Sequence, residues 1–477
     1  MSWRLDVSTN SQGPTAQDRT SRYTIAIAMV AGLGGLMFGY DIGVIADAKD
    51  GIRHAFGLGD NEVSTVVSSV LAGSFLGALI AGRLCDAIGR RWTNVWGGIC
   101  FIVGCLGCAF SVDLTMIIAF RVVMGIGVGF SSVAGPLYIA EVSTPWSRGA
   151  MVSLYQLAIT VGILVAFLVG LAVPEADWRI SFGLGVLLGA ALIAGMLVMP
   201  PSPRWLVSRG RYDVALGVLK RTLGSDREAE KELETIKQRV VEESGEGFWS
   251  AVKGSHAVRM ALILAIGLAF LQQASGINAI FYYAPEILKE VGLGEYGKEL
   301  TAALGLINVL ATFIAIWLVD RVGRRPLLLG GTALMMVSQV VIGVTGTLFL
   351  AKGGSAVSAG GIVILISLFV GIIAFAFSLG PLVWLAISEI FPAGVRSACV
   401  GVATSFNWIG NYVIAQGSLA AVEFSPSLAF WIFAGFNAVT IAFVYFRMPE
   451  TKGVPLEEIE SFFAKGRSAK TEGLPSE

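Results

Sequence analysis

The chain has 477 residues, of which 55% are hydrophobic and only 14% are charged, and its mean hydropathy is +0.73. Soluble proteins carry charge on roughly 25% of their residues, so this composition predicts an integral membrane protein. The 34 basic and 34 acidic residues cancel, which excludes the positive field that nucleic-acid binding requires. The first 22 residues are polar and lack the apolar core of a cleaved signal peptide, so we expect the first membrane helix to target the chain.

Apolar segments long enough to cross a bilayer recur along the whole chain. A transmembrane helix needs about 20 mostly apolar residues, and twelve segments meet this requirement, at approximately 24–45, 63–83, 93–111, 115–138, 150–173, 179–199, 258–283, 299–319, 326–350, 361–388, 397–421 and 428–447. The charged stretch 200–257 separates them into two sets of six and predicts a cytoplasmic helical linker. We expect an all-α membrane protein with six-helix halves at 23–199 and 258–447 and tails at 1–22 and 448–477.

The positions of the basic residues predict the orientation of these helices. If the N-terminus is cytoplasmic, most Lys and Arg residues lie on the cytoplasmic side, and the exceptions are Arg121 within a span and, near the outer side, Lys49, Arg53, Arg179, Lys289, Lys298 and Lys352. Because the cytoplasmic loops of membrane proteins carry the excess of Lys and Arg, we expect both ends of the chain in the cytoplasm.

Two pairs of loop motifs indicate an internal repeat. The segment "GRLCDAIGRR" (82–91) follows the second span and "WLVDRVGRR" (317–325) follows the eighth. Similarly, "AEVSTPWSRG" (140–149) ends the fourth span and "SEIFPAGVRS" (388–397) ends the tenth, with an acid seven residues before an arginine in both. Two parallel halves related by an axis along the membrane normal place a substrate site between them near the midplane and imply alternating access.

These motifs, with others in the same order, resemble the sugar porter family of the major facilitator superfamily. The resemblance runs from "GGLMFGYDIGVI" (34–45) through "SPRWL", "QQASGINAIFYYAP" and "GPLVWLAISEIFP" to "PETKG" (449–453), which is nearly the whole chain. It implies the major facilitator fold and transport of a monosaccharide, either a hexose or a pentose, or of a related polyol. We expect a monomer in the plasma membrane with no cofactor, metal ion or nucleic-acid partner. An enzyme has no support in the sequence, which shows no paired catalytic carboxylates, no nucleophile elbow and no His/Cys cluster with metal-ligand spacing.

The same resemblance implies that the charged loop residues form ion-pair networks that latch the cytoplasmic side while the carrier opens outward. The residues concerned are Asp86, Arg90, Arg91, Glu141 and Arg148 in the first half, and Asp320, Arg324, Arg325, Glu389 and Arg396 in the second. An alternative is that these arginines only reflect the excess of basic residues in cytoplasmic loops and form no latch. The chain departs from the family where an acid usually follows the sixth span, because Pro201 stands there in "PPSPR".

Polar side chains within the seventh span predict a binding site. An unpaired carboxamide in hydrocarbon loses its hydrogen bonds to water, so Gln272 and Gln273 should face the bundle interior. In an unbroken helix Asn278 would lie about 240° round from Gln272, so we expect the helix to bend near Gly276. Neutral hydrogen-bonding groups together with aromatic surface suit the hydroxyls and apolar faces of a sugar.

The family resemblance extends this site to further spans. The expected substrate-binding residues are Gln156, Gln272, Gln273, Asn278, Tyr283, Asn308, Trp384, Asn407 and Trp408, with Trp384 stacking on the sugar. Each of them taken singly is also compatible with an interhelical hydrogen bond or with packing. Gly380 and Pro381 suggest a flexible gate in the tenth span.

Two charged residues lie within apolar spans, Asp41 in the first and Arg121 in the fourth. Each is costly at bilayer depth unless it is paired, so we expect them to meet. A carboxyl that alternates between an arginine pair and a protonated state carries one proton per cycle. Proton-coupled members of the resembled family have aspartate after "FGY", which favours proton symport. The alternatives are a facilitative uniporter and a sugar sensor that does not transport.

The segment "GVIADAKD" departs from the family pattern at the outer end of the first span. It places Asp47, Lys49 and Asp50 where relatives usually read Gly-Val-Ile-Ser-Gly or Gly-Val-Ile-Ala-Gly. These charges either solvate the helix end or alter the electrostatics that the substrate and the proton encounter there.

Overall fold

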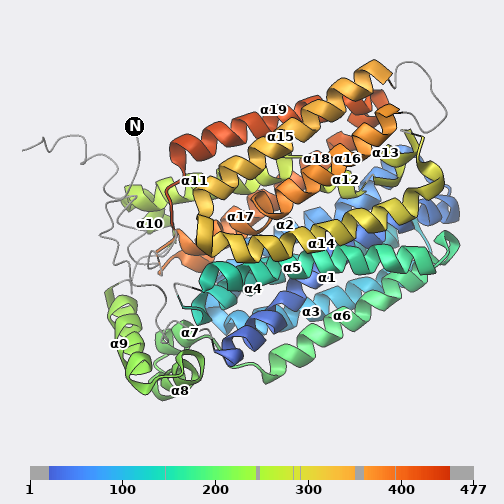
Figure 1. The fold of residues 1–477 in the computed structure, drawn as a ribbon. Helices are drawn as coiled ribbons and strands as arrows, with labels where there is room; N and C mark the ends of the chain where they lie inside the picture. The colour runs from blue at the N-terminus through green and yellow to red at the C-terminus, as the bar shows by residue number, and fades with distance from the viewer. Residues whose placement is uncertain are drawn as a thin grey trace, which may run out of the picture.

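The computed structural model describes residues 21–144, 147–242, 248–282, 284–290, 292–349, 359–392 and 394–451. Within these residues every regular element is a helix, and the long helices run roughly side by side in one bundle (Figure 1). The shorter helices α8 (Tyr212–Leu223) and α9 (Asp226–Glu242) lie together at one end of that bundle.

The first half consists of six long helices. They are α1 (Arg22–Phe56), α2 (Asp60–Ile88), α3 (Arg90–Ala109), α4 (Leu114–Val142), α5 (Arg148–Ala172) and α6 (Trp178–Val198). Side chains cap two of them, because Ser21 Oγ accepts from the N–H of Thr24 at 3.1 Å and Asp113 Oδ1 from that of Met116 at 2.7 Å. Helix α1 continues well beyond the apolar segment expected at 24–45, so the "GVIADAKD" segment is helical.

The linker between the halves also forms helices, α7 (Pro203–Ser208), α8, α9 and α10 (Phe248–Gly254). The first three share a small apolar core of their own, which includes Leu206, Leu219 and Leu233. Arg209 joins this cluster to the first half, since its Nη2 donates to the backbone oxygens of Asp86 at 3.0 Å and Ala87 at 2.7 Å. The linker therefore packs at the end of the bundle that carries the repeated loop motifs.

The second half repeats the arrangement with two interrupted helices. Its elements are α11 (His256–Ala274), α12 (Ile277–Tyr282), α13 (Ala284–Glu290), α14 (Gly297–Val322), α15 (Arg324–Phe349), α16 (Ala359–Ala376), α17 (Leu379–Glu389), α18 (Arg396–Phe424) and α19 (Pro426–Arg447). The expected seventh span is divided into α11 and α12, and the expected tenth into α16 and α17. Interrupted membrane helices are tolerated where they line a cavity.

Eleven helical stretches among the described residues are long and apolar enough to cross a membrane. The twelfth expected span, α18, is not among them, and it carries the polar residues Asn407, Asn411 and Gln416. Asn407 and Asn411 are buried inside the protein, as is expected for polar side chains at membrane depth. The layout is that of twelve helices in two halves, as the sequence predicts.

The halves contact one another mainly through α2 with α18 and through α5 with α14. At one of these contacts a Cβ on Gly82 would lie 2.5 Å from the backbone oxygen of Ser397, which is too close for any other residue. Small residues let membrane helices approach closely. The helices of both halves can therefore enclose a common interior.

Candidate substrate-binding site

The break in the seventh span lies at the "SGIN" segment. Helix α11 ends at Ala274, Gly276 has a φ of +82°, and α12 begins at Ile277. A Cβ at position 276 would also lie 2.4 Å from the ring of Phe433, so both the backbone angle and the available space require glycine. The bend that the sequence predicts near Gly276 is present.

This break brings the carboxamides on either side of it into one hydrogen-bonded chain. Asn278 Nδ2 donates to Gln273 Oε1 at 2.7 Å, and Gln273 Nε2 donates to Asn407 Oδ1 at 2.9 Å. Asn407 Nδ2 in turn donates to Gln272 Oε1 at 2.7 Å. All four side chains are at least 93% buried. They form a neutral polar cluster in which amide oxygens and nitrogens satisfy one another.

A cavity lies beside this cluster and is lined by both halves of the protein. The cavity is narrow in this structure, because the space open to a water-sized molecule is about 20 Å³, roughly enough for one water molecule. The residues that line it are Phe38, Ile42, Gln156, Ile159, Ile163, Gln272, Gln273, Ile277, Asn278, Phe281, Asn308, Phe375 and Trp384. None of these side chains is ionisable, so the cavity offers hydrogen bonds and aromatic surface without fixed charge.

Asn308 supplies an acceptor that the described part of the protein leaves unused. The side chain is 1% exposed and lines the cavity, and its Oδ1 has no hydrogen-bond partner among the described residues. A buried acceptor without a partner is costly. A ligand hydroxyl in the cavity could supply the missing donor.

Trp384 is held on the cavity wall by other aromatic rings. Its centroid is 6.0 Å from that of Tyr155 and 6.4 Å from that of Phe38, and both contacts are edge-to-face. The helix that carries it, α17, is in turn attached to α11, because Gln272 Nε2 donates to the backbone oxygen of Leu379 at 2.7 Å. The two interrupted helices are therefore joined next to the cavity.

The structure does not bring every expected residue to the cavity wall. Asn407 lies behind Gln272 and Gln273 and supports them. Trp408 lies behind Phe38, with ring centroids 4.7 Å apart, and its Nε1 donates to Ser132 Oγ at 3.2 Å. Tyr283 lies outside the described residues. The other six expected residues, Gln156, Gln272, Gln273, Asn278, Asn308 and Trp384, line the cavity.

Sequence reasoning misses the apolar part of the wall. Phe38, Ile42, Phe281 and Phe375 occur in uniformly apolar spans, where one more apolar side chain carries no signal. On α5 a signal does exist, because Ile159 and Ile163 follow Gln156 by three and seven residues and share its helix face.

The two charged residues within the first half lie next to each other. Arg121 Nη1 is 3.4 Å from Asp41 Oδ1, and the two residues are 0% and 4% exposed. Arg121 also donates through Nε to the backbone oxygen of Val66 at 2.7 Å and through Nη2 to that of Val67 at 3.3 Å. These carbonyl acceptors keep the guanidinium hydrogen-bonded beside the carboxylate.

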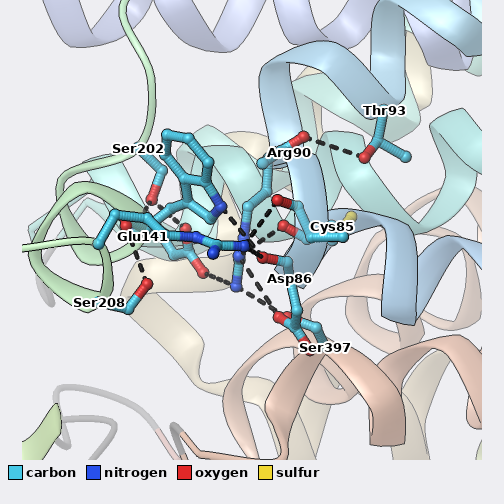
Figure 2. A network of polar contacts seen from close by, with 12 residues as sticks. Cys85, Asp86, Arg90, Thr93, Glu141, Ser202, Ser208 and Ser397 are labelled. Atoms are coloured by element: carbon cyan, nitrogen blue, oxygen red, sulfur yellow. Dashed lines mark hydrogen bonds and ion pairs between the residues drawn. The ribbon is translucent and has the colours of Figure 1, made fainter.

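The loop motif of the first half gathers around Arg90 (Figure 2). Its Nη2 lies 2.8 Å from Glu141 Oε1 and donates to Ser397 Oγ of the other half at 2.7 Å. Its Nη1 lies 3.6 Å from Asp86 Oδ1. Ser202 follows Pro201 in the "PPSPR" segment, where the chain departs from the family pattern, and its Oγ donates to Glu141 Oε2. One guanidinium therefore connects both halves, and the serine of the linker joins the same network.

The second half has the corresponding network around Arg324. Its Nη2 lies 3.9 Å from Glu389 Oε1, and Glu450 Oε1 and Oε2 accept from the backbone N–H groups of Arg324 and Arg325, each at 3.0 Å. Thr451 Oγ1 donates to Glu389 Oε2 at 3.2 Å. The side chain of Asp320 lies outside the described residues. Glu450 thus caps the positive end of α15.

Matching hydrogen bonds in the two halves show the internal repeat in atomic detail. Arg91 Nη2 donates to the backbone oxygen of Leu197 in α6, and Arg325 Nη2 donates to that of Tyr445 in α19, both at 2.7 Å. Arg148 and Arg396, the arginines of the second pair of repeated motifs, each bond to a backbone oxygen of their own half. Arg148 Nε donates to an oxygen of α4 at 3.3 Å and Arg396 Nε to the Phe391 oxygen at 2.9 Å.

Lys49, from the segment that departs from the family pattern, joins the two halves at the other end of the bundle. Its Nζ donates to the backbone oxygen of Tyr282, the last residue of α12, at 2.8 Å, and the residue is only 4% exposed. Asp47 packs against α5, where a Cβ on Gly170 would touch its carboxylate. Solvation of the helix end therefore does not account for Lys49.

Two similar six-helix halves around a neutral cavity, with arginine networks at one end, define a secondary transporter of the major facilitator type. The solved structure of the proton:xylose symporter XylE bound to 6-bromo-6-deoxy-D-glucose has the same fold. Its TM-score is 0.84 at 28% identity over 92% of this chain and 99% of that one.

The chain belongs to the family described as Sugar (and other) transporter, whose sequence profile matches residues 27–463. It is 35% identical to the arabinose-proton symporter of Escherichia coli (strain K12) over 97% of this chain and 98% of that protein. It is 37% identical to the galactose-proton symporter of the same strain over 94% of this chain and 96% of that protein. The protein is a multi-pass membrane transporter and not an enzyme.

Proposed function

We propose that the protein carries a monosaccharide, or a related polyol, across the membrane together with a proton. The observation that supports this most strongly is the chemistry of the cavity, where carboxamides and a tryptophan meet without any ionisable side chain among the described residues. Sugar hydroxyls need donors and acceptors, and the C–H faces of the ring need apolar contact. The names of the relatives, which are symporters of arabinose, galactose and xylose with protons, agree with this chemistry.

In this proposal the sugar is held by Gln156, Gln273, Asn278 and Asn308, and Trp384 packs on one face of its ring. The unused oxygen of Asn308 accepts a hydroxyl, and Gln273 exchanges one of its amide partners for the sugar. Gln272, Asn407 and Trp408 act mainly by supporting these side chains. Tyr283, which follows α12 directly, stays part of the proposed site.

The proton in this proposal is carried by Asp41. In the outward-facing state the carboxylate takes up a proton and separates from Arg121, and on the inner side it releases the proton and pairs again. The two side chains are buried and 3.4 Å apart. This supports the proton role of Asp41, because the energy of a buried ion pair changes strongly when one of its charges is neutralised.

The ion-pair networks around Arg90 and Arg324 act as a latch on the cytoplasmic side. Arg91, Glu141, Arg148, Arg325, Glu389 and Arg396 belong to it, together with Asp86 and Asp320 by their place in the motifs. The bond from Arg90 to Ser397 supports a latch role, because it must break when the halves separate at this end. We also propose a monomer in the plasma membrane with both termini in the cytoplasm, on the distribution of basic residues.

Counterflow in proteoliposomes against a panel of labelled sugars and polyols tests the substrate class. We expect exchange of at least one monosaccharide or polyol, and a Gln273→Ala variant should raise its half-saturating concentration about tenfold, because one lost hydrogen bond contributes roughly 0.5–1.5 kcal/mol. Thr347→Ala is the control, since the Thr347 hydroxyl donates to the Gly343 oxygen of its own helix at 2.7 Å, and α15 supplies no residue to the described cavity wall. Binding without exchange would favour a non-transporting sensor.

Proton coupling is tested by uptake into proteoliposomes with an imposed pH gradient. We expect accumulation against the sugar gradient, abolished by a protonophore. In Asp41→Asn the accumulation should be lost while counterflow persists, because exchange needs no net proton movement. Equilibrative uptake by the unaltered protein, unaffected by the protonophore, would refute symport and favour a uniporter.

A further inference from the structure

The break at Gly276 is held by two helices that contribute nothing to the cavity wall. Gln339 lies on α15 and Asn437 on α19, and neither helix supplies a lining residue. The two helices pack against each other and run side by side along one edge of the bundle (Figure 1). Gln339 is 1% exposed and Asn437 is 0% exposed.

Gln339 satisfies the backbone at the break. In an unbroken helix the carbonyl oxygen of Ser275 would accept from the N–H four residues later. Here the positive φ of Gly276 turns the chain, and the Ser275 oxygen accepts instead from Gln339 Nε2 at 2.7 Å. A carbonyl without a partner in the lipid-embedded interior is costly, so this donor stabilises the interrupted conformation.

Asn437 fixes the orientation of that donor and joins it to the packing around Gly276. Its Nδ2 donates to Gln339 Oε1 at 2.7 Å and to the backbone oxygen of Phe433 at 3.1 Å. The ring of Phe433 occupies the space in which a side chain at position 276 would lie. One network of two amides therefore holds both the carbonyl and the packing of the break.

The consequence for the cavity follows from the positions of Gln273 and Asn278. They lie on opposite sides of the break, and their 2.7 Å hydrogen bond exists only because the helix changes direction between them. If the segment relaxed toward a continuous helix, Asn278 would rotate away from Gln273 and from the cavity.

We propose that Gln339 and Asn437 are positioning residues of the substrate site, which hold the seventh helix in its broken form so that Gln273 and Asn278 face one cavity. The proposal rests on the proposed sugar site. It assigns a function in substrate affinity to two buried amides that do not touch the substrate.

The test compares Gln339→Met with Ser338→Ala in sugar counterflow. Gln339→Met keeps the size of the side chain and removes the donor. It should raise the half-saturating sugar concentration about tenfold, equivalent to about 1.4 kcal/mol, and leave the maximal exchange rate per reconstituted molecule within about twofold. The control removes a buried hydroxyl whose one bond among the described residues stays within α15, to the Met335 oxygen at 2.8 Å, and it should leave both quantities unchanged.

Asn437→Ala provides a second, milder variant that retains the bond from Gln339 to Ser275. Its half-saturating concentration should rise by about threefold, and the double variant should show less than the product of the single effects, because both act through one carbonyl. If Gln339→Met does not reconstitute, the half-saturating concentration of Asn437→Ala tests the proposal. An unchanged half-saturating concentration in the variants that fold would overturn the proposal.

Hydrogen–deuterium exchange gives a measurement that does not depend on transport. The N–H of Ile280 donates to the Gly276 oxygen at 3.2 Å. Exchange over residues 274–282 without sugar should be slower in Gln339→Met than in Ser338→Ala, because relaxation toward a continuous helix would bond the N–H of Ala279 to the Ser275 oxygen. Equal exchange would also overturn the proposal. Absence of counterflow in the unaltered protein would instead refute the proposed sugar transport, and the exchange comparison would still report on the break.

Discussion

Replacing Gly276 by alanine adds a single methyl group at the point where the seventh helix changes direction. Two costs can be worked out from the structure. The φ of +82° is unfavourable for an L-residue by about 1–2 kcal/mol. The new Cβ would lie 2.4 Å from the ring of Phe433, and relieving such overpacking costs typically about 1–3 kcal/mol. The total is about 2–5 kcal/mol, borne by every conformation that keeps the break.

The chain can avoid this cost only by relaxing toward a continuous helix, which turns Asn278 away from Gln273. We therefore expect Gly276→Ala to lower the Tm in detergent and to raise the half-saturating sugar concentration at least about tenfold, since each 1.4 kcal/mol corresponds to a factor of ten. Thermal unfolding with and without sugar, together with counterflow, measures the two effects.

The matched control is Gly435→Ala on α19, two residues beyond Phe433. A Cβ there meets nothing within 4 Å, and the residue is helical, so we expect unchanged affinity and a Tm that is unchanged or slightly raised. If Gly276→Ala matched this control in both Tm and affinity, the reasoning that glycine is required at the break would be wrong.

Three further substitutions test other parts of the structure. Glu450→Gln removes the charge that accepts from two N–H groups at the start of α15, so the Tm should fall by an amount equivalent to about 0.5–1 kcal/mol, and an unchanged Tm would contradict this capping. A thiol introduced by Lys49→Cys should react more slowly with an external water-soluble reagent when sugar is bound, because position 49 is buried against Tyr282 in this structure. Equal modification rates with and without sugar would exclude closure of the halves at this position. Tyr155→Phe removes a hydroxyl that has no partner among the described residues and keeps the ring contact with Trp384, so Tm and affinity should be retained, and a clear loss of either would show that the hydroxyl contributes.

The interruption of the seventh helix could be predicted from the sequence because it follows from local geometry. The angle between Gln272 and Asn278 in a regular helix is fixed, and a polar side chain in hydrocarbon must find a partner. Gly276 is the residue between them that tolerates a change of direction, and it has the positive φ. The pairing of Asp41 with Arg121 follows from the same cost of an isolated charge in the membrane.

The division of labour among the polar residues could not be predicted in this way. Asn407 and Asn308 are both buried asparagines in membrane helices, yet Asn308 lines the cavity and Asn407 supports the glutamines behind it. The difference depends on how α14 and α18 are rotated against their neighbours, which the hydropathy of either helix does not specify. Trp408 lies behind Phe38 for the same reason.

The sequence by itself determined that the chain crosses a bilayer in two sets of six helices, because the thickness of the hydrocarbon core and the cost of burying charge act on each segment separately. The tertiary structure decided which side chains meet. Gln339 reaches Ser275 from 64 positions away, Lys49 reaches Tyr282 across both halves, and Arg90 reaches Ser397. Such contacts depend on helix rotation and close approach, which are properties of the packed bundle and of no single segment.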